Sequence, residues 1–553
     1  MEKKRSSFKI INSLISLLGN LKYLIKLAVF GGVLGNLCAI SVMTFGAIGV
    51  CKLIDENSIQ MPLWLIILLT IGSGVLRGLL RFFEQYNNHY IAFTLLAELR
   101  NKIFHALARL APSKLEDKQK GSLISMLTAD IETLEVFYAH TISPVLIAFY
   151  TNGIIVVLVS IISNIYLGLI ALASYLIIGI AVPFISFKFL KKEGKEYRND
   201  FAVSSSYFLD SIKGINELTI HNAYQERKDF INRESHKMNK RTISIKRKSS
   251  IVDSVTLFMV SFVILLTTLV GVLFVIHNML SLTSLIIALV LIFSSFGPVL
   301  ALANLPSNLT QTFASGDRIL DLLEEKPAVM ENDSDITFDF QNVKLENVSF
   351  SYGDHLILDN VNLEINTNEI IGIVGESGSG KSTILKLLDR FYDVNSGSIL
   401  YNNINIKDIN TNSLRNNVVL VSQSTYLFDD TILNNIKFVK EDATLDEIKE
   451  ACRLASIDDF ISSLPNGYDT EVGLLGDSLS AGEKQRIGLA RAFLSGAKLI
   501  LLDEVTSNVD AINEGIILRS IKNIKDKAFV IVSHRESTVS IANRVYHMNN
   551  GKV

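Results

Sequence analysis

A glycine-rich stretch in the second half of the chain has the residue types that hold a triphosphate. It reads Gly375-Glu376-Ser377-Gly378-Ser379-Gly380-Lys381-Ser382-Thr383 and fits the pattern G-x-x-x-x-G-K-[ST]. An apolar run, 370–374, precedes it, and a helix-like run, 384–388, follows it. Glycines let backbone N–H groups curl around an anion, and the next helix points its positive N-terminus there. We expect these residues to bind a nucleoside triphosphate, with Lys381 reaching the β- and γ-phosphates and the Ser382 hydroxyl holding Mg²⁺.

A second apolar run, 499–502, ends in two acidic residues, Asp503 and Glu504. An acid at the carboxyl end of a strand beside a phosphate loop is placed to hold Mg²⁺, and we assign that role to Asp503. Hydrolysis of a triphosphate depends mainly on positioning and charge stabilisation, so Glu504 would orient and activate the attacking water. A strand that simply ends in two solvated acids is the structural alternative, but Lys381 upstream favours the catalytic interpretation.

A third motif, Leu479-Ser480-Ala481-Gly482-Glu483, lies between the other two and resembles the L-S-G-G-Q signature of ATP-binding cassette (ABC) transporters. The resemblance implies that Ser480 and Gly482, at a helix N-terminus, contact the γ-phosphate of ATP held by another cassette. Two cassettes must then close face to face, so the working unit should be a dimer of this chain with a second half-transporter.

The remaining motifs of that family follow in order. Tyr352 matches the aromatic residue that stacks on adenine, Gln423 the glutamine that reaches nucleotide and Mg²⁺, the stretch Ser507-Asn508-Val509-Asp510 the D-loop, and His534 the catalytic histidine near the γ-phosphate. Three residues depart from the family pattern, namely Ala481 for glycine, Glu483 for glutamine and Val505 for proline. We expect one weaker ATP site, as in asymmetric heterodimers, because glutamate adds negative charge and alanine disfavours a left-handed backbone.

The composition divides the chain into a membrane part and a soluble part. Of 553 residues 49% are hydrophobic, and the mean hydropathy of +0.34 is too high for an ordinary soluble enzyme. Six segments have the length and apolarity of a bilayer span, at about 25–52, 62–83, 138–160, 164–187, 253–277 and 282–304. The net charge of −2 gives no attraction to nucleic acid, and the three cysteines show neither disulfide nor metal spacing.

The connections between these spans alternate in charge. The stretches 84–137 and 188–252 are long and rich in Lys and Arg, whereas the other connections are short and contain neither. Since positive charge stays in the cytoplasm, both long stretches, both termini and the phosphate loop are expected on the cytoplasmic side of a bacterial inner membrane. Helical spacing extends the spans into these stretches, with turns at 112–121 and 204–214 that would dock on the cassettes. Residues 8–18 suit a short helix lying on the membrane surface.

The predicted fold is therefore a polytopic α-helical membrane domain followed by an α/β P-loop NTPase domain. Residues 1–310 form the first, 311–341 a linker and 342–553 the cassette. The resemblance covers the whole chain and implies a type I ABC exporter half-transporter, an ATP hydrolase coupled to transport by alternating access.

Two stretches near the second and third spans are similar to the CydC-like subunit of heterodimeric cysteine/glutathione exporters. They are 81–96, with Arg81 to His89 at its start, and 134–144. This similarity implies export of a small thiol, amino acid or peptide, and haem ligation by His89. Charged residues at 77, 81 and 84 are costly within a span and indicate either a ligand pathway or a polar helix face near the interface.

Two other functions fit the same motifs. The same architecture can import a metallophore or haem-like ligand, and a family member can act as an ATPase sensor or regulator without transport. Intact Lys381, Asp503, Glu504 and His534 argue against an inactive regulatory cassette.

Overall fold

The computed structural model describes residues 5–55, 59–116, 118, 120–303, 305–473, 476, 478–507 and 509–553. Asn508, predicted as part of the D-loop, lies outside this set. The chain forms two compact units. One comprises Met1–Arg109 and Asp117–Glu325, and the other comprises Leu110–Glu116 and Lys326–Val553. The predicted linker 311–341 is divided between them, because helix α13 (Leu305–Glu324) belongs to the first unit.

The first unit is helical. Its other α-helices are α1 (Ser7–Ser16), α2 (Lys22–Ile54), α3 (Leu63–Leu110), α4 (Lys120–Ser125), α5 (Ile131–Phe137), α6 (Ser143–Ile162), α7 (Ile165–Leu176), α8 (Val182–Lys213), α9 (Ile215–Ile220), α10 (Tyr224–Ile276), α11 (Leu282–Ser294) and α12 (Phe296–Ala303), with π-helical turns at Met126–Asp130 (η2), Tyr138–Ile142 (η3) and Ile177–Ala181 (η4). Among the described residues, six helical segments are long and apolar enough to cross a membrane, which confirms the six predicted spans.

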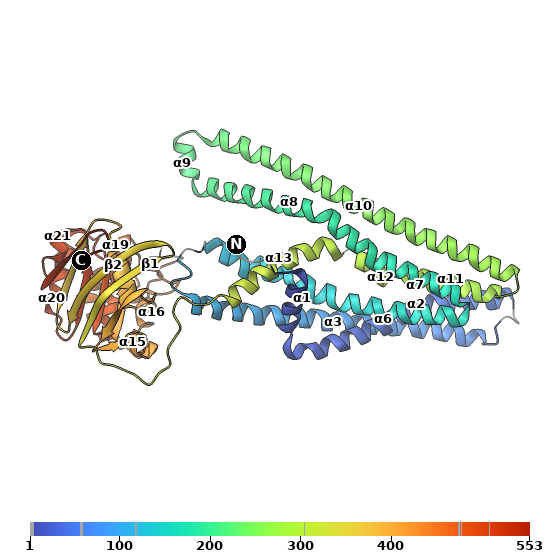
Figure 1. The fold of residues 1–553 in the computed structure, drawn as a ribbon, viewed down its shortest axis with the longest axis horizontal. Helices are drawn as coiled ribbons and strands as arrows, with labels where there is room; N and C mark the ends of the chain where they lie inside the picture. Colours follow the sequence, from blue (N-terminus) through green and yellow to red (C-terminus); the bar gives the residue numbers. More distant parts are fainter. Residues whose placement is uncertain are drawn as a thin grey trace. The chain divides into compact units, whose positions relative to one another are not determined.

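Two of these helices extend far past a bilayer. Helix α3 has 48 residues and α10 has 53, and at about 1.5 Å per residue each is more than twice as long as a span requires. Figure 1 shows α8 and α10 side by side, joined at one end by α9. The helical extensions predicted from residue spacing are therefore present.

The turn predicted at 204–214 is wrong over most of its length, because α8 continues to Lys213. Three serines at 204–206 suggest a break, but packing against α10 keeps this segment helical. The Tyr207 ring lies 3.9 Å from the Phe230 ring, and the Arg227 guanidinium lies 4.4 Å above Tyr207. The helix ends instead at Gly214, whose N–H donates to the Asp210 carbonyl.

The N-terminal helix α1 forms as expected, but protein covers its apolar face. Ser6 caps the helix, and Ile10, Leu14 and Leu18 are buried. A Cβ on Gly316 of α13 would lie 3.2 Å from Leu14, so the two helices are in close contact. Helix α1 therefore packs on α13 rather than presenting these side chains to lipid.

The second unit holds two sheets. Its strands are β1 (Asn342–Tyr352), β2 (His355–Asn366), β3 (Ile370–Gly375), β4 (Ser396–Tyr401), β5 (Ile404–Asn405), β6 (Val418–Val421), β7 (Leu499–Asp503), β8 (Ala528–Val532) and β9 (Arg544–Met548). Its helices are α14 (Lys381–Leu388), α15 (Thr411–Asn417), α16 (Ile432–Lys437), α17 (Leu445–Leu454), α18 (Asp458–Ser463), α19 (Ala481–Leu494), α20 (Ala511–Asn523) and α21 (Glu536–Val539). The antiparallel sheet has the order β2-β1-β4-β5, and the parallel sheet has the order β6-β7-β8-β3-β9.

The parallel sheet is buried on both faces. Along β7, Leu499 and Leu501 belong to one hydrophobic core and Ile500 and Leu502 to the other. Continuous apolar runs are typical of such strands, which is why β3, β6, β7 and β8 could be predicted from the sequence. The antiparallel sheet packs over one face, where Phe350 shares a core with Leu499.

The end of α3 and the turn that follows belong to the cassette unit. Ser113 Oγ donates to the Phe391 carbonyl, and the Tyr392 hydroxyl donates to the Ser113 carbonyl at 3.1 Å. Lys386 of α14 pairs with Glu116 at 2.8 Å. The turn predicted at 112–121 is thus present over Pro112–Glu116 and contacts the helix that follows the phosphate loop.

Candidate functional site

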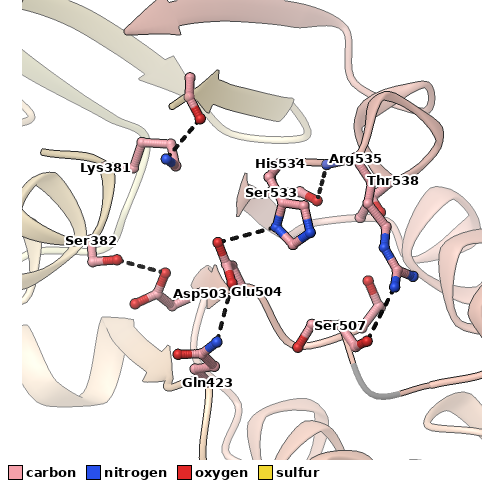
Figure 2. A network of polar contacts seen from close by, with 12 residues as sticks. Lys381, Ser382, Gln423, Asp503, Glu504, Ser507, Ser533, His534, Arg535 and Thr538 are labelled. Carbon is pink, nitrogen blue, oxygen red and sulfur yellow. Dashed lines mark hydrogen bonds and ion pairs between the residues drawn. The ribbon is translucent and has the colours of Figure 1, made fainter. Parts of the chain in front are cut away.

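The predicted ATP-binding residues meet at the carboxyl edge of the parallel sheet. The phosphate loop follows β3, Asp503 ends β7, and His534 lies just beyond β8. Gln423 follows β6 on the far side of β7. Since parallel strands all end at the same edge, side chains from distant parts of the sequence converge there. Figure 2 shows Lys381, Ser382, Gln423, Asp503, Glu504 and His534 around one space.

The phosphate loop has the shape of an anion cradle. Gly378 and Gly380 have φ values of +83° and +102°, which side chains rarely tolerate. A Cβ at Gly375 would lie 2.3 Å from the Met548 carbonyl oxygen, so this position also requires glycine. Gly380 directly precedes α14, whose N-terminal N–H groups are oriented to bind a phosphate.

Two polar groups of the loop fit a bound anion. The buried Lys381 Nζ donates to the carbonyls of Gly375 and Glu376, at 2.9 and 2.7 Å. The Ser379 hydroxyl is buried and makes no hydrogen bond with any described residue. A bound phosphate would place its negative charge beside the Lys381 ammonium and accept a hydrogen bond from the Ser379 hydroxyl. The residues present therefore fit a nucleoside triphosphate.

Two of the three predicted magnesium ligands, Ser382 and Asp503, are already paired. Ser382 Oγ donates to Asp503 Oδ1 at 2.9 Å. Burial raises the pKa of Asp503, and the Glu504 charge adds to this, while the Ser382 hydrogen bond and two lysines act in the opposite direction. A hydroxyl and a partly buried carboxylate are oxygen ligands that suit Mg²⁺, and the cation would stabilise the ionised carboxylate.

Glu504 is held from both sides. Gln423 Nε2 donates to Glu504 Oε2 at 3.2 Å, and His534 Nδ1 lies 3.4 Å from Oε1 (Figure 2). Its backbone has φ +51°, an uncommon conformation for a residue with a side chain, and its N–H donates to the Val532 carbonyl on β8. When ATP and Mg²⁺ are bound, this carboxylate can accept a proton from water, and His534 and Gln423 fix its orientation.

Five residues that sequence reasoning missed support this arrangement. Gln485 Nε2 donates to the Gln423 carbonyl at 2.8 Å, and Arg535 Nη2 donates to the Ser507 carbonyl at 3.3 Å. The buried Glu514 carboxylate accepts hydrogen bonds from Thr506 at 3.0 Å and from Thr538 at 2.6 Å. Glu514 therefore ties the segment after Glu504 to the segment after His534. No spacing pattern marks it, because its partners lie 8 and 24 positions away.

The signature motif lies apart from this network. Ser480 caps α19 by accepting from the Glu483 N–H, and the Glu483 carboxylate accepts from the Ser480 N–H at 2.7 Å. In the described part of the chain, no hydrogen bond joins Ser480 or Gly482 to the phosphate loop. Ser480 and Ala481 are exposed on the cassette surface. The structure thus leaves the signature free to meet another molecule.

The departures from the family pattern take local roles in this structure. Ala481 is the first residue of α19 and its φ is not left-handed, so a methyl group costs nothing there. The Glu483 carboxylate completes the capping box rather than standing free. Tyr352 ends β1 with its ring 5.2 Å from that of Tyr392, in an edge-on contact.

The helical unit contains a polar cavity of about 550 Å³. Its wall includes Arg77, Arg81 and Glu84 of α3 and His140. Glu84 is almost fully buried and pairs with Arg81 at 2.8 Å. The intramembrane charges predicted from the sequence therefore line a cavity and do not simply form one solvated helix face.

Comparisons with known proteins cover both units. The family model described as "ABC transporter transmembrane region" matches residues 25–299, and the one described as "ABC transporter" matches 358–507. The chain belongs to the ABC transporter family. A Haemophilus influenzae protein described as "Probable ABC transporter ATP-binding/permease protein" is 44% identical over 552 residues, covering all of both chains.

More distant relatives carry other names. An "ATP-dependent lipid A-core flippase" of Desulfotalea psychrophila is 30% identical over 88% of this chain and 85% of its own. The solved "Structure of a bacterial Atm1-family ABC exporter with ATP bound" superposes with a TM-score of 0.84 at 21% identity, covering 96% of this chain and 94% of that one. This likeness confirms the exporter fold.

The family fixes the broad activity. The chain is a multi-pass membrane protein with an ABC ATPase domain, which implies ATP with Mg²⁺ and hydrolysis coupled to transport. The finer similarity to CydC-like subunits is not reproduced among these relatives. Nothing in the comparisons supports haem at His89.

Proposed function

We propose that this chain is one half of an ATP-driven exporter that moves a small thiol, amino acid or peptide by alternating access. The polar cavity of the helical unit carries this proposal. Arg77 and Arg81 offer positive charge and Glu84 negative charge within it. A zwitterionic or anionic solute of a few hundred Å³ matches both the volume and the charges, whereas a purely apolar cargo would leave them unsatisfied.

The dimeric assembly rests on two exposed surfaces. Helices α8 and α10 form a hairpin whose tip is α9. At this hairpin tip, the side chains of Ile212, Ile215 and Ile220 are exposed by 53%, 53% and 72%. On the cassette, a cavity of about 330 Å³ is lined by Tyr426, Phe428 and Phe438, all exposed. Both surfaces are apolar and exposed. The hairpin tip of one chain would therefore dock in this aromatic groove on its partner's cassette.

A second chain also completes the ATP site. Ser480 is exposed and, among the described residues, makes no hydrogen bond to this chain's phosphate loop, which supports a contact with the ATP held by a second cassette. We propose a heterodimer in which the methyl group of Ala481 and the charge of Glu483 weaken the ATP site that this signature completes on the partner, although neither residue strains this chain's own fold. Mutation of Glu504 and of its equivalent in the partner tests this asymmetry, and equal losses of ATPase activity would contradict it.

We place the protein in a bacterial inner membrane with its termini and cassette in the cytoplasm. The Lys- and Arg-rich stretches at 84–137 and 188–252 support this orientation. Import and a purely regulatory role have no comparable support. The complete set of Lys381, Asp503, Glu504 and His534 favours turnover, and no relative reported above is named as an importer.

ATPase stimulation in reconstituted vesicles tests the cargo. The chain, with a half-transporter from an adjacent gene, is assayed with thiols, amino acids, peptides, lipid A and haem. We expect stimulation by one of the first three classes, reduced at least tenfold by Arg77→Ala. Arg100→Ala, an exposed arginine on the same helix, should leave stimulation intact. Stimulation by lipid A alone would replace this proposal with lipid flipping.

A further inference from the structure

A cluster of three metal-binding side chains lies beside the cavity. His89 of α3, Glu135 of α5 and His140 of η3 each offer one ligand atom, and these atoms all lie within 4.8 Å of one another. His89 Nδ1 is 3.4 Å from Glu135 Oε1. The ATP site uses none of these residues. The two stretches that the sequence singled out, around His89 and around His140, thus come together in the fold.

A π-helical turn brings Glu135 and His140 together. They are five positions apart, and in a regular α-helix side chains at that spacing point about 140° away from each other. The turn at Tyr138–Ile142 is π-helical, and Thr141 Oγ1 donates to the Val136 carbonyl five residues earlier at 3.0 Å. This wider turn moves His140 toward the face of Glu135. Such turns are frequent at functional sites.

The inner nitrogen of His89 is unsatisfied. Nδ1 is shielded from solvent and makes no hydrogen bond with any described residue. Its nearest charged neighbour is Glu135, and the His140 ring centroid is 5.3 Å from that of His89 in an edge-on arrangement. A buried nitrogen beside a carboxylate and a second imidazole requires either a proton or a metal ion between them.

We propose that His89, Glu135 and His140 bind a divalent transition-metal ion of the Zn²⁺ class. Two imidazoles and one carboxylate form a donor set that Zn²⁺ prefers, and three protein ligands leave a fourth position open. In a tetrahedral zinc site the ligand atoms lie about 3.3 Å apart, as bond lengths near 2.0 Å require. The His89–Glu135 separation already matches this spacing, and exposed His140 needs only a side-chain adjustment.

The proposed site borders a charged cavity at His140. His140 lines the 550 Å³ cavity together with Gln85, Asn88 and the two arginines. The fourth ligand of the metal is therefore water or an anionic group drawn from that cavity. This site is independent of the proposed cargo, because it is built from this chain's own side chains alone.

Metal titration of the full-length chain tests the site. The protein is purified in detergent with an affinity tag free of histidine, stripped with a chelator and titrated with Zn²⁺ and, as a spectroscopic probe, Co²⁺. We expect one zinc ion per chain and the visible absorption of tetrahedral Co²⁺. His89→Ala, His140→Ala and Glu135→Gln should each weaken zinc binding at least tenfold.

Matched controls lie on the same helices. His105→Ala on α3 and Glu132→Gln on α5 change the same residue types outside the cluster and should bind zinc as the wild type does. Size-exclusion chromatography and helical circular dichroism establish that each variant is folded. Equal zinc binding by the wild type and folded His89→Ala, or a loss of binding in His105→Ala, would overturn the proposal. Haem binding without zinc would do the same.

Discussion

At the scale of single residues, Glu504 combines an uncommon backbone with two side-chain contacts. A positive φ costs free energy in a residue with a side chain, and such conformations cluster at active sites. Gln423 and His534 contact one carboxylate oxygen each, which leaves Glu504 little freedom to rotate. A base held in this way needs no reorganisation when water approaches.

Replacing Glu504 by glutamine should abolish turnover and preserve nucleotide binding. The amide keeps the shape of the side chain but cannot accept a proton from water, and loss of a general base costs about 10²- to 10⁴-fold in rate. Phosphate release measures the hydrolysis, and fluorescent ATP measures the binding. A variant that retains more than half of wild-type turnover would remove Glu504 from the catalytic role.

Replacing Asp503 by asparagine should raise the melting temperature of nucleotide-free protein near neutral pH. The raised pKa of Asp503 means that ionisation destabilises the folded state, so stability is lost as the pH rises through that pKa. The amide removes this cost and still accepts the Ser382 hydrogen bond. The difference should vanish at a pH below the pKa, as differential scanning fluorimetry would show. A lower melting temperature for Asp503→Asn across the whole range would contradict this account.

The residues that would contact ATP and Mg²⁺ could be predicted from the sequence. The residues that hold them in position could not. The phosphate loop, the acidic pair and His534 have fixed types and follow recognisable strands. Glu514 and Gln485 reach the same site from helices whose apolar pattern says nothing about which polar residue points inward. Their roles depend on tertiary packing, which only the structure supplies.

At the scale of elements, the turn that follows α3 packs on the cassette, beside the helix that begins at the phosphate loop. The Ser113 hydroxyl donates to the Phe391 carbonyl, the Tyr392 hydroxyl donates to the Ser113 carbonyl, and Glu116 pairs with Lys386. Burial lowers the pKa of Lys386, but the hydrogen bond to Glu116 and the nearby charges of Glu116 and Asp503 together outweigh burial, so the net pKa is raised. Because α14 begins at the loop, a displacement of this helix reaches the phosphate-binding residues directly.

Reversing one charge of this pair should impair coupling more than stability. Glu116→Lys places two lysines together, so cargo should no longer stimulate ATPase activity, while basal activity stays within about twofold. A half-exposed ion pair contributes only about 0–1 kcal/mol to stability, so the fold should survive. The double variant Glu116→Lys with Lys386→Glu restores opposite charges and should recover stimulation. Failure to recover would mean that this pair does not carry the coupling.

Some elements were predicted and others were not. Apolar length revealed the six spans, and continuous apolar runs revealed the buried strands. The turn at 204–214 was misplaced because three serines suggest a break, whereas Tyr207 and Arg227 hold the segment in a helix. Likewise, the apolar face of α1 suggested lipid, but α13 covers it.

At the scale of the whole molecule, one chain carries each part of the ATP site once. The phosphate loop and Glu504 lie at one sheet edge, and Ser480 is exposed on the surface. The hairpin tip and the aromatic groove of the cassette are likewise exposed and apolar. We propose that a partner chain covers these surfaces and that the two cassettes together complete two ATP sites.

We propose that ATP hydrolysis at this cassette drives a solute across the membrane. The most direct measurement is uptake of radiolabelled cysteine, glutathione, amino acids and short peptides into inside-out vesicles that contain this chain and its partner. We predict ATP-dependent accumulation of at least one solute, reduced at least tenfold by Glu504→Gln. ATP hydrolysis with no accumulation of any of these solutes, or accumulation that Glu504→Gln leaves unchanged, would contradict the account.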